Sequence, residues 1–220
     1  MRVSSLSNSQ TTALEADAPR MNRRQAAKVR TRQKVLDAAR GLFAERGYDA
    51  ATIRDIAKGA GMSTGAVFAN FQDKNELFEA VQIEDMANML TDFRNGAGAD
   101  GQVRDRLAGA MTAGYHRTLE HLPLMQAVIA RSWFQPQAND TRQRELVRPL
   151  VEVIIGVLQD GIRAGEVHQD VDLMLLGRTL WDTYISNFRY AAYDGWTIEQ
   201  LTPHTRKQID LILSSQLSRQ

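Results

Sequence analysis

The 220-residue sequence contains no cysteine, which excludes disulfide bonds and zinc sites built on thiolates. It also lacks a long apolar run, because the longest, at 151–158, contains Glu152 and is far shorter than the roughly 20 residues of a membrane-spanning helix. The N-terminus has no apolar segment of the kind that directs secretion. We therefore expect a chain without leader or membrane anchor that resides in the cytoplasm.

Motifs for catalysis or metal binding are missing as well. The four histidines, at positions 116, 121, 168 and 204, lack the His-Glu-x-x-His spacing of zinc hydrolases, and no Ser-His-Asp grouping can be recognised. A formal G-x-G-x-x-G match spans 96–101, but no predicted strand precedes it, so we interpret it as a loop between helices. We expect no catalytic residue, no metal and no cofactor, and we do not expect an enzyme.

Charge is present but unevenly divided. Residues 1–74 carry 13 Lys and Arg against 7 Asp and Glu, whereas the rest of the chain carries 14 against 19. A basic first third joined to an acidic body is typical of a protein that meets a polyanion with its front end only. A solvated basic tail would have the same composition, so charge alone leaves both interpretations open.

Hydrophobic spacing is helical along the chain, and no strand-like alternation lasts more than a few residues, which predicts an all-α fold. An apolar stripe predicts a first helix over 30–46, ended by Gly47. Thr52 is a predicted N-cap for a short second helix, and Gly61 provides a tight turn. Ser63 then caps a short third helix. Two short helices joined by a glycine turn predict a helix-turn-helix.

Longer helices are predicted beyond this motif. Asp73, with Glu76 three residues later, is typical of a cap that begins a fourth helix over about 74–93. Further helices are predicted at about 101–121, 123–135, 140–164, 171–193 and 203–218, the last with Thr202 as N-cap and Pro203 as first helical residue. Residues 1–24 are too polar to order themselves and are expected to form a disordered tail.

Residues 52–71 read TIRDIAKGAGMSTGAVFANF, and the sequence over about 30–78 resembles the TetR family of bacterial regulators. The shared features are Phe43 and Gly47 at the end of the first helix, Ile53, Ile56 and Ala57 behind Thr52, the turn from Gly61 to Ser63, the aromatic pair Phe68 and Phe71, and Lys74. The resemblance implies a helix-turn-helix DNA-binding domain over 25–73, with the motif at 52–71. It also implies a helical ligand-binding and dimerisation domain over 74–220.

Candidate DNA contacts follow from these positions. A major groove admits one helix, whose first residues reach base edges, which predicts base contacts from Thr64, Gly65, Ala66, Ala69 and Asn70. Phosphate contacts are predicted for Arg30, Arg32, Thr52, Arg54, Ser63 and Lys74. Phe68 stands where the family usually has tyrosine and can offer only its ring. Because few of these side chains donate hydrogen bonds, we expect readout to depend on thymine methyl groups, Asn70 and DNA shape. An ordinary helical hairpin is the alternative.

The body of the chain carries the predictions for dimerisation. One recognition helix covers only a few base pairs, so specific binding to double-stranded operator DNA requires a homodimer. The resemblance implies that the last two helices pair with their symmetry mates. The candidate contacts are Leu176, Leu180, Thr183, Ile209, Ile212, Leu213 and Leu217. Packing of these stripes inside their own domain is the alternative.

Aromatic and polar-tipped residues concentrate in the middle helices, as expected of a small-molecule pocket. The candidate ligand contacts are Tyr115, His116, Met125, Trp133, Phe134, Trp181, Tyr184 and Phe188, with core packing as the alternative for each. The favoured function is a ligand-responsive transcriptional regulator, a repressor released from its operator by a small-molecule effector. An all-helical enzyme or carrier acting on the pocket ligand, and an architectural DNA binder without effector, remain open.

Overall fold

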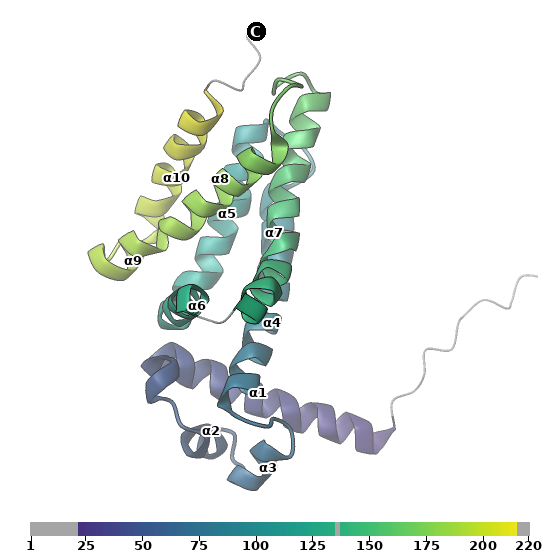
Figure 1. Ribbon diagram of the computed structural model, residues 1–220, viewed down its shortest axis with the longest axis vertical. Helices are drawn as coiled ribbons and strands as arrows, with labels where there is room; N and C mark the ends of the chain where they lie inside the picture. Colours follow the sequence, from purple (N-terminus) through teal and green to yellow (C-terminus); the bar gives the residue numbers. More distant parts are fainter. Residues whose placement is uncertain (1–21, 135–136, 215–220) are drawn as a thin grey trace, which may run out of the picture.

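The computed structural model describes residues 22–134 and 137–214 as ten helices (Figure 1). A small unit contains α1 (Arg23–Ala50), α2 (Ile53–Gly59) and α3 (Thr64–Phe68), and α4 (Lys74–Ala97) runs from it into a larger body. The body adds α5 (Val103–Leu119), α6 (Leu122–Phe134), α7 (Gln137–Arg163), α8 (Leu173–Ser186), α9 (Phe188–Asp194) and α10 (Ile198–Leu213). The predicted all-α class is confirmed. Of the tail predicted over 1–24, residues 1–21 lie outside the described residues, and the prediction is wrong for the rest: Asn22 caps α1, and Arg23 and Arg24 are its first residues.

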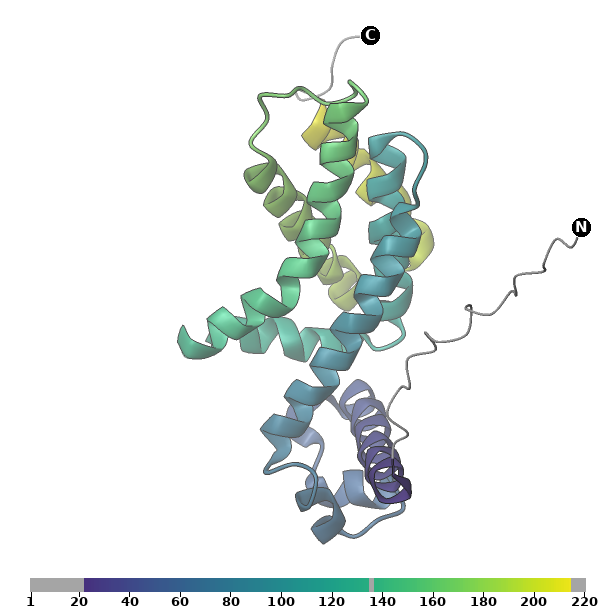
Figure 2. The same cartoon turned by 90° about the vertical axis from the view of Figure 1, so that its right-hand side faces the viewer.

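The small unit is held together by one apolar face from each helix. Val35 and Phe43 of α1, Ile56 of α2 and Val67 of α3 are each fully buried. The ring of Phe43 meets the edge of Phe78 of α4 at 5.3 Å, which joins the unit to the long helix. In Figure 2, α4 is a continuous rod from the small unit into the body, so any movement of its first turns moves the small unit as well.

The caps predicted at Thr52, Ser63 and Asp73 are confirmed. The side chains of Thr52, Ser63 and Asp73 each accept a hydrogen bond from the backbone N–H three residues later, at the starts of α2, α3 and α4. Gly61, between α2 and α3, has φ +67°, a left-handed conformation that costs glycine least. The turn chemistry of the sequence therefore places the helix-turn-helix correctly.

The fourth helix is longer than predicted and includes Gly96. A Cβ at Gly96 would lie 2.4 Å from the carbonyl oxygen of Gly109 in α5, so only glycine permits this close approach of α4 and α5. The interpretation of 96–101 as a loop is therefore wrong for Gly96 and Ala97, and the connection begins at Gly98.

The last predicted helices are also corrected. The expected helix over 171–193 is two helices, α8 and α9, separated at the buried Asn187. The final helix begins at Ile198 rather than 203, because Thr197 and Gln200 form a capping box there and Thr202 is not the N-cap. Pro203 therefore lies inside α10, on an exposed position.

Within the described residues, no helix combines the length and apolarity needed to cross a bilayer. The same residues hold no group of three His, Asp or Glu side chains arranged to bind a metal ion.

Candidate DNA interface and ligand site

The third helix lies at the end of the molecule away from the body (Figure 1). Val67 is fully buried and anchors α3 against the small unit, whereas Thr64, Gly65 and Ala69 are exposed and Ala66 is half-buried. Phe68 is 54% exposed, which is unusual for an aromatic residue. The helix therefore presents one face to solvent, as insertion into a DNA groove requires.

The predicted phosphate-binding cations divide into two groups. Arg30 and Arg54 are exposed. Arg32 instead donates from Nη1 to the carbonyl oxygen of Asn70 at 2.8 Å, and its guanidinium lies 4.1 Å from the centre of the Phe71 ring. Its main contacts are therefore internal, joining α1 to the end of α3.

Lys74 is also engaged within the chain. Its Nζ lies 2.9 Å from the carbonyl oxygen of Tyr48, 3.4 Å from that of Asp49 and 3.1 Å from that of Ala51. These are the carbonyls at the end of α1, where an ammonium group is favourable. The three oxygens match the three N–H donors of the lysine in number. A contact between Lys74 and phosphate therefore stays a prediction, and it would compete with these three hydrogen bonds.

Two polar side chains of the motif have local partners too. The Thr52 hydroxyl donates to the Asp55 carboxylate at 2.6 Å, and this bond lowers the pKa of Asp55. Asn70 donates from Nδ2 to the carbonyl oxygen of Ala66 at 2.9 Å. To donate to a phosphate, the Thr52 hydroxyl must leave Asp55, because it has a single hydrogen. Asn70 can keep its bond and still contact a base through its second N–H or its Oδ1.

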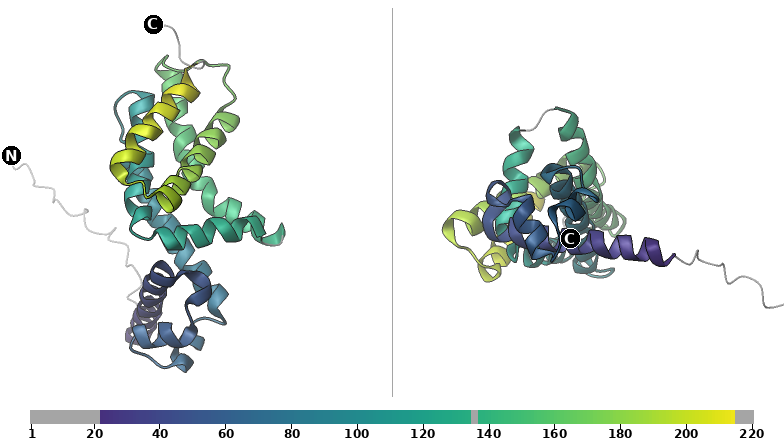
Figure 3. Two further views of the ribbon diagram at one scale, coloured as in Figure 1. Left: turned by 90° about the vertical axis from the view of Figure 1, so that its left-hand side faces the viewer. Right: turned by 90° about the horizontal axis from the view of Figure 1, so that it is seen from below.

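A groove that the sequence reasoning missed lies between the start of α1 and the end of α3. It has a volume of about 520 Å³ and is lined by Asn22, Arg24, Gln25, Lys28, Thr31, Ala69 and Asn70. Figure 3 shows the first turns of α1 projecting beyond the other helices. The spacing of Arg24 and Lys28, four residues apart on one helix face, would have indicated this basic edge.

The predicted aromatic pocket is a closed core. Tyr115 and Tyr184 are fully buried with ring centres 4.6 Å apart, and Phe188 meets both rings edge-on at 5.3 Å. A Cβ at Gly114 would lie 2.3 Å from Phe93 and 2.5 Å from the Tyr184 hydroxyl, so even one more carbon does not fit beside them.

Hydrogen bonds complete this core. The Tyr115 hydroxyl donates to the Tyr184 carbonyl oxygen at 3.2 Å and accepts from Asn187 Nδ2 at 3.0 Å. Burial raises the pKa of Tyr115 to about 12, although the bonds with Thr205 and Asn187 oppose the shift. Tyr115, Trp181, Tyr184 and Phe188 are therefore core residues in this structure rather than the lining of a cavity.

The other candidate ligand contacts are scattered. His116 is exposed, and Met125 is nearly buried beside a cavity described below. The side chains of Trp133 and Phe134 lie outside the described part of the chain. Aromatic residues at helical spacing suggested a pocket, but most of them pack the core of the body, a role that the same spacing serves equally well.

An open cavity lies instead at the junction of α1, α4, α5 and α6; we call it the junction cavity. Its volume is about 180 Å³. The apolar part of its wall consists of Met86, Met89, Leu124, Met125 and Val128. The polar part consists of Arg40, Gln82, Asp85, Asn88, Arg117, Thr118 and His121.

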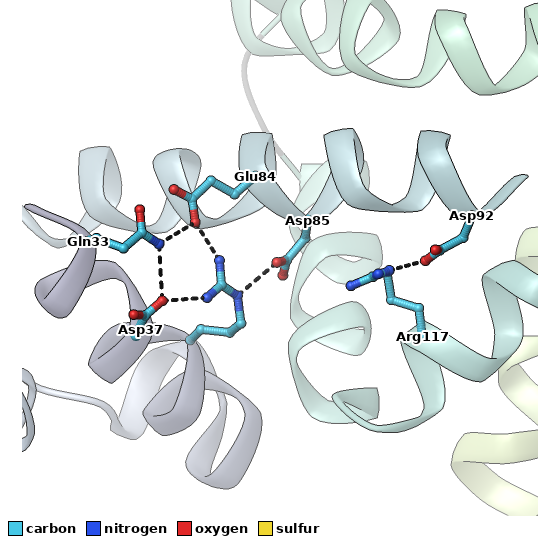
Figure 4. A network of polar contacts seen from close by, with 7 residues as sticks. Gln33, Asp37, Glu84, Asp85, Asp92 and Arg117 are labelled. Carbon is cyan, nitrogen blue, oxygen red and sulfur yellow. Dashed lines mark hydrogen bonds and ion pairs between the residues drawn. The ribbon is translucent and has the colours of Figure 1, made fainter. Parts of the chain in front are cut away.

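A group of charged side chains at this junction connects α1 with α4; we call Asp37, Arg40, Glu84 and Asp85 the Arg40 cluster. Arg40 contacts Asp85 at 2.8 Å, Glu84 at 2.6 Å and Asp37 at 3.1 Å. Partial burial lowers the pKa of Arg40, but the bonds and charges of Asp85 and Glu84 outweigh that effect and raise it. Figure 4 shows Glu84 and Asp85 on one helix facing Asp37 on the other.

The predicted dimer contacts also prove to be largely internal. Leu180 and Leu213 are fully buried, Ile209 is 1% exposed and Leu176 8% exposed, while Thr183 and Ile212 are half-buried. Leu217 lies outside the described residues. The four buried residues pack against other parts of their own chain. The exposed apolar side chains of the same helices are Met174, Leu175 and Leu211.

The fold and the exposed third helix define a helix-turn-helix DNA-binding protein. Residues 35–81 match the family model described as "Bacterial regulatory proteins, tetR family". This match covers most of α1, the helix-turn-helix and the first turns of α4, and this part of the chain is similar to that family of transcriptional regulators.

Three named proteins are similar to this chain over longer stretches. The HTH-type transcriptional repressor Rv1474c of Mycobacterium tuberculosis is 46% identical over 77 residues, which are 35% of this chain and 41% of that repressor. The repressor AcnR of Corynebacterium diphtheriae is 29% identical over 192 residues, which are 86% of this chain and 93% of AcnR. The crystal structure of the regulator FadR from Bacillus subtilis, in complex with stearoyl-CoA, has a TM-score of 0.72 at 18% identity and covers 83% of this chain and 97% of FadR.

Proposed function

We propose that this chain is a repressor that binds a specific operator as a homodimer and leaves it when a small effector binds. The single observation that supports this most strongly is the solvent-facing side of α3, which ends in the 54% exposed ring of Phe68. It acts by binding DNA rather than by catalysis, in the cytoplasm. The repressor names of its relatives and the ligand in the FadR structure support the two halves of the proposal.

On the operator, α3 lies in the major groove and reads bases chiefly through small groups. Thr64 and Ala69 present methyl groups, and Thr64 adds a hydroxyl. Because so few donors face the bases, groove width and flexibility contribute much of the specificity. Ser63, whose oxygen caps α3, contacts a phosphate together with Arg30 and Arg54. The basic groove beside Arg24 and Lys28 follows the phosphate backbone of the same strand.

The dimer forms through the outer faces of α8 and α10, which lie side by side on one flank of the body (Figures 1 and 3). Leu175 is 65% exposed and Leu211 74% exposed, so each helix offers an apolar side chain to a second copy. The buried leucines beneath them keep these helices rigid. A two-fold axis here presents two copies of α3 to successive turns of one DNA face.

The test is a selection of operator sequences from a pool of random duplexes, followed by affinity measurements over a range of salt concentrations. We expect a palindromic site whose half-sites are about one or two helical turns apart, because two recognition helices read it. The selected duplex should bind roughly 1,000-fold or more tightly than a scrambled duplex of equal length. Equal affinities at every salt concentration would show that the protein does not read sequence.

Repression itself is tested by transcription in vitro from a promoter that overlaps the selected site. The protein should lower transcript yield on this template and leave a template with a scrambled site unaffected. Increased yield on the operator template would make the protein an activator.

A further inference from the structure

The junction cavity brings two arginines from different helices to one opening. Arg40 reaches it from α1 and Arg117 from α5, while the carboxylate in its wall is Asp85 of α4. Asp37 and Glu84 hold Arg40, and Asp92 holds Arg117, from outside the cavity wall. The wall itself therefore carries two positive groups against one negative group, with amides at Gln82 and Asn88 as additional donors.

Arg117 is placed to receive an anion. Its Nε donates to Asp92, and in Figure 4 the far end of its guanidinium is directed toward Asp85 rather than toward Asp92. The bond to Asp92 raises the pKa of Arg117, and the charge of Asp85 adds to this effect, so the side chain is cationic. Its side chain is 40% exposed, which leaves the rim open to solvent. A carboxylate can accept two parallel hydrogen bonds from such a guanidinium.

The rest of the wall favours an apolar group of limited size. Met86, Met89 and Met125 are flexible, polarizable side chains that adapt to a ring or a branched chain. A cavity of roughly 150 Å³ lined by apolar side chains holds a benzene molecule. The volume of about 180 Å³ therefore suits one aromatic ring or a short branched chain.

We propose that the junction cavity is the effector site and that it binds a small monocarboxylate whose apolar part is about the size of one aromatic ring. The carboxylate lies against Arg117 and within the field of Arg40, and the ring contacts the methionines. The ligand's negative charge repels Asp85 and competes with it for Arg40, whose 2.8 Å contact with Asp85 joins α1 to α4. Binding therefore loosens the Arg40 cluster and shifts the small unit relative to the body. This consequence for DNA binding depends on the proposed function.

The experiment uses three probes of one shape and different charge: benzoate, benzamide and benzamidine. Each is titrated by calorimetry against the full chain at up to about 10 mM, and thermal unfolding is recorded in parallel. Benzoate should bind and raise the unfolding midpoint, and benzamide and benzamidine should each bind about tenfold more weakly or not at all. Tighter binding of benzamidine, or no binding of benzoate, would overturn the proposal.

Three variants locate the site. Arg117→Gln should weaken benzoate about tenfold or more, because a charge-assisted bond is lost. Asp85→Asn should strengthen it, because the opposing charge is removed. Arg163→Gln removes another arginine that has a carboxylate partner but lies far from the cavity. This control should change the affinity for benzoate by no more than about twofold. Circular dichroism confirms that each variant is folded; equal benzoate affinity in folded Arg117→Gln and wild type would place the ligand elsewhere.

The effect on DNA is measured separately, by anisotropy with the selected operator in the presence of each probe. Benzoate should weaken operator binding, and benzamide at the same concentration should not. Operator binding that is specific but indifferent to bound benzoate would refute the coupling and leave the repressor assignment intact. Benzoate binding by a chain without sequence-specific DNA binding would refute the repressor and leave the carboxylate site intact.

Discussion

At the scale of single residues, Gly114 shows how tightly the core of the body is packed. A Cβ there would lie 2.3 Å from Phe93 and 2.5 Å from the hydroxyl of Tyr184, both fully buried. Neither ring has room to move, because Tyr184 also packs against Tyr115 and Phe188. Glycine is therefore required by the space beside it and not by its backbone conformation.

We expect Gly114→Ala to destabilise the protein by about 1–3 kcal/mol through overpacking, measured by urea unfolding. Gly156→Ala is the matched control, since Gly156 lies inside α7 and a Cβ there meets nothing within 4 Å. The control should stabilise the protein by roughly 0.5–1 kcal/mol, the helical preference of alanine over glycine. A stabilising Gly114→Ala would mean that the aromatic core has free volume and can serve as a ligand pocket after all.

At the scale of helices, the junction between α1 and α4 depends on charged side chains that serve structure first. Lys74 holds the carbonyl oxygens at the end of α1, and the Arg40 cluster joins the middle of α1 to α4. These contacts explain why a lysine at the start of α4 does not by itself indicate a phosphate contact. The exposed cations at the start of α1 are better placed for that role.

We expect Lys74→Ala and Lys28→Ala to differ in kind. Lys74→Ala should lower the free energy of unfolding by about 1–2 kcal/mol, because carbonyls at the helix end lose a charged donor. Lys28→Ala should leave stability unchanged and lower the slope of log affinity for DNA against log salt by about one, because one phosphate contact is lost. The measurements are urea unfolding and anisotropy over a salt series. If Lys74→Ala lowered the slope without loss of stability, the lysine would be a phosphate contact.

At the scale of the whole molecule, two units are arranged along α4, and the proposed function as a homodimer depends on how a second copy pairs with the body. The small unit carries one α3, and the faces proposed to pair are at the far end of the body (Figure 1). The spacing of two recognition helices is therefore set by contacts distant from DNA. Any change at the junction of α1 and α4 alters that spacing, which is how a small effector acts on a large complex.

We expect Leu211→Glu to convert the protein to a monomer in sedimentation velocity, because a charge is introduced into an apolar contact between copies. Specific operator affinity should fall by at least about 100-fold, since only one half-site is then read at a time. The thermal unfolding of the monomer should still be cooperative, because Leu213 and Ile209 remain packed inside the chain. Ile83→Glu is the control: Ile83 is 43% exposed on α4, away from α8 and α10, and should leave the dimer intact. A dimeric Leu211→Glu would place the interface on another face.

Local sequence patterns predicted the helix-turn-helix and its resemblance to the TetR family. Caps at Thr52, Ser63 and Asp73 and the turn at Gly61 act over three or four residues, so their consequences can be derived from neighbours in the chain. The helical class followed from hydrophobic spacing for the same reason. These local rules also located the exposed helix that meets DNA.

Which apolar and polar side chains remain free depends on packing between helices, and this became visible in the fold alone. Tyr115 and Leu180 have the same helical spacing whether they line a pocket, form an interface or fill a core, and packing between distant helices made them core. The lysine at 74 and the arginine at 40 are likewise engaged by residues 23 to 45 positions away. Burial and pairing of this kind are set by contacts between elements far apart in sequence, and hydrophobic periodicity contains no information about which element will be the partner.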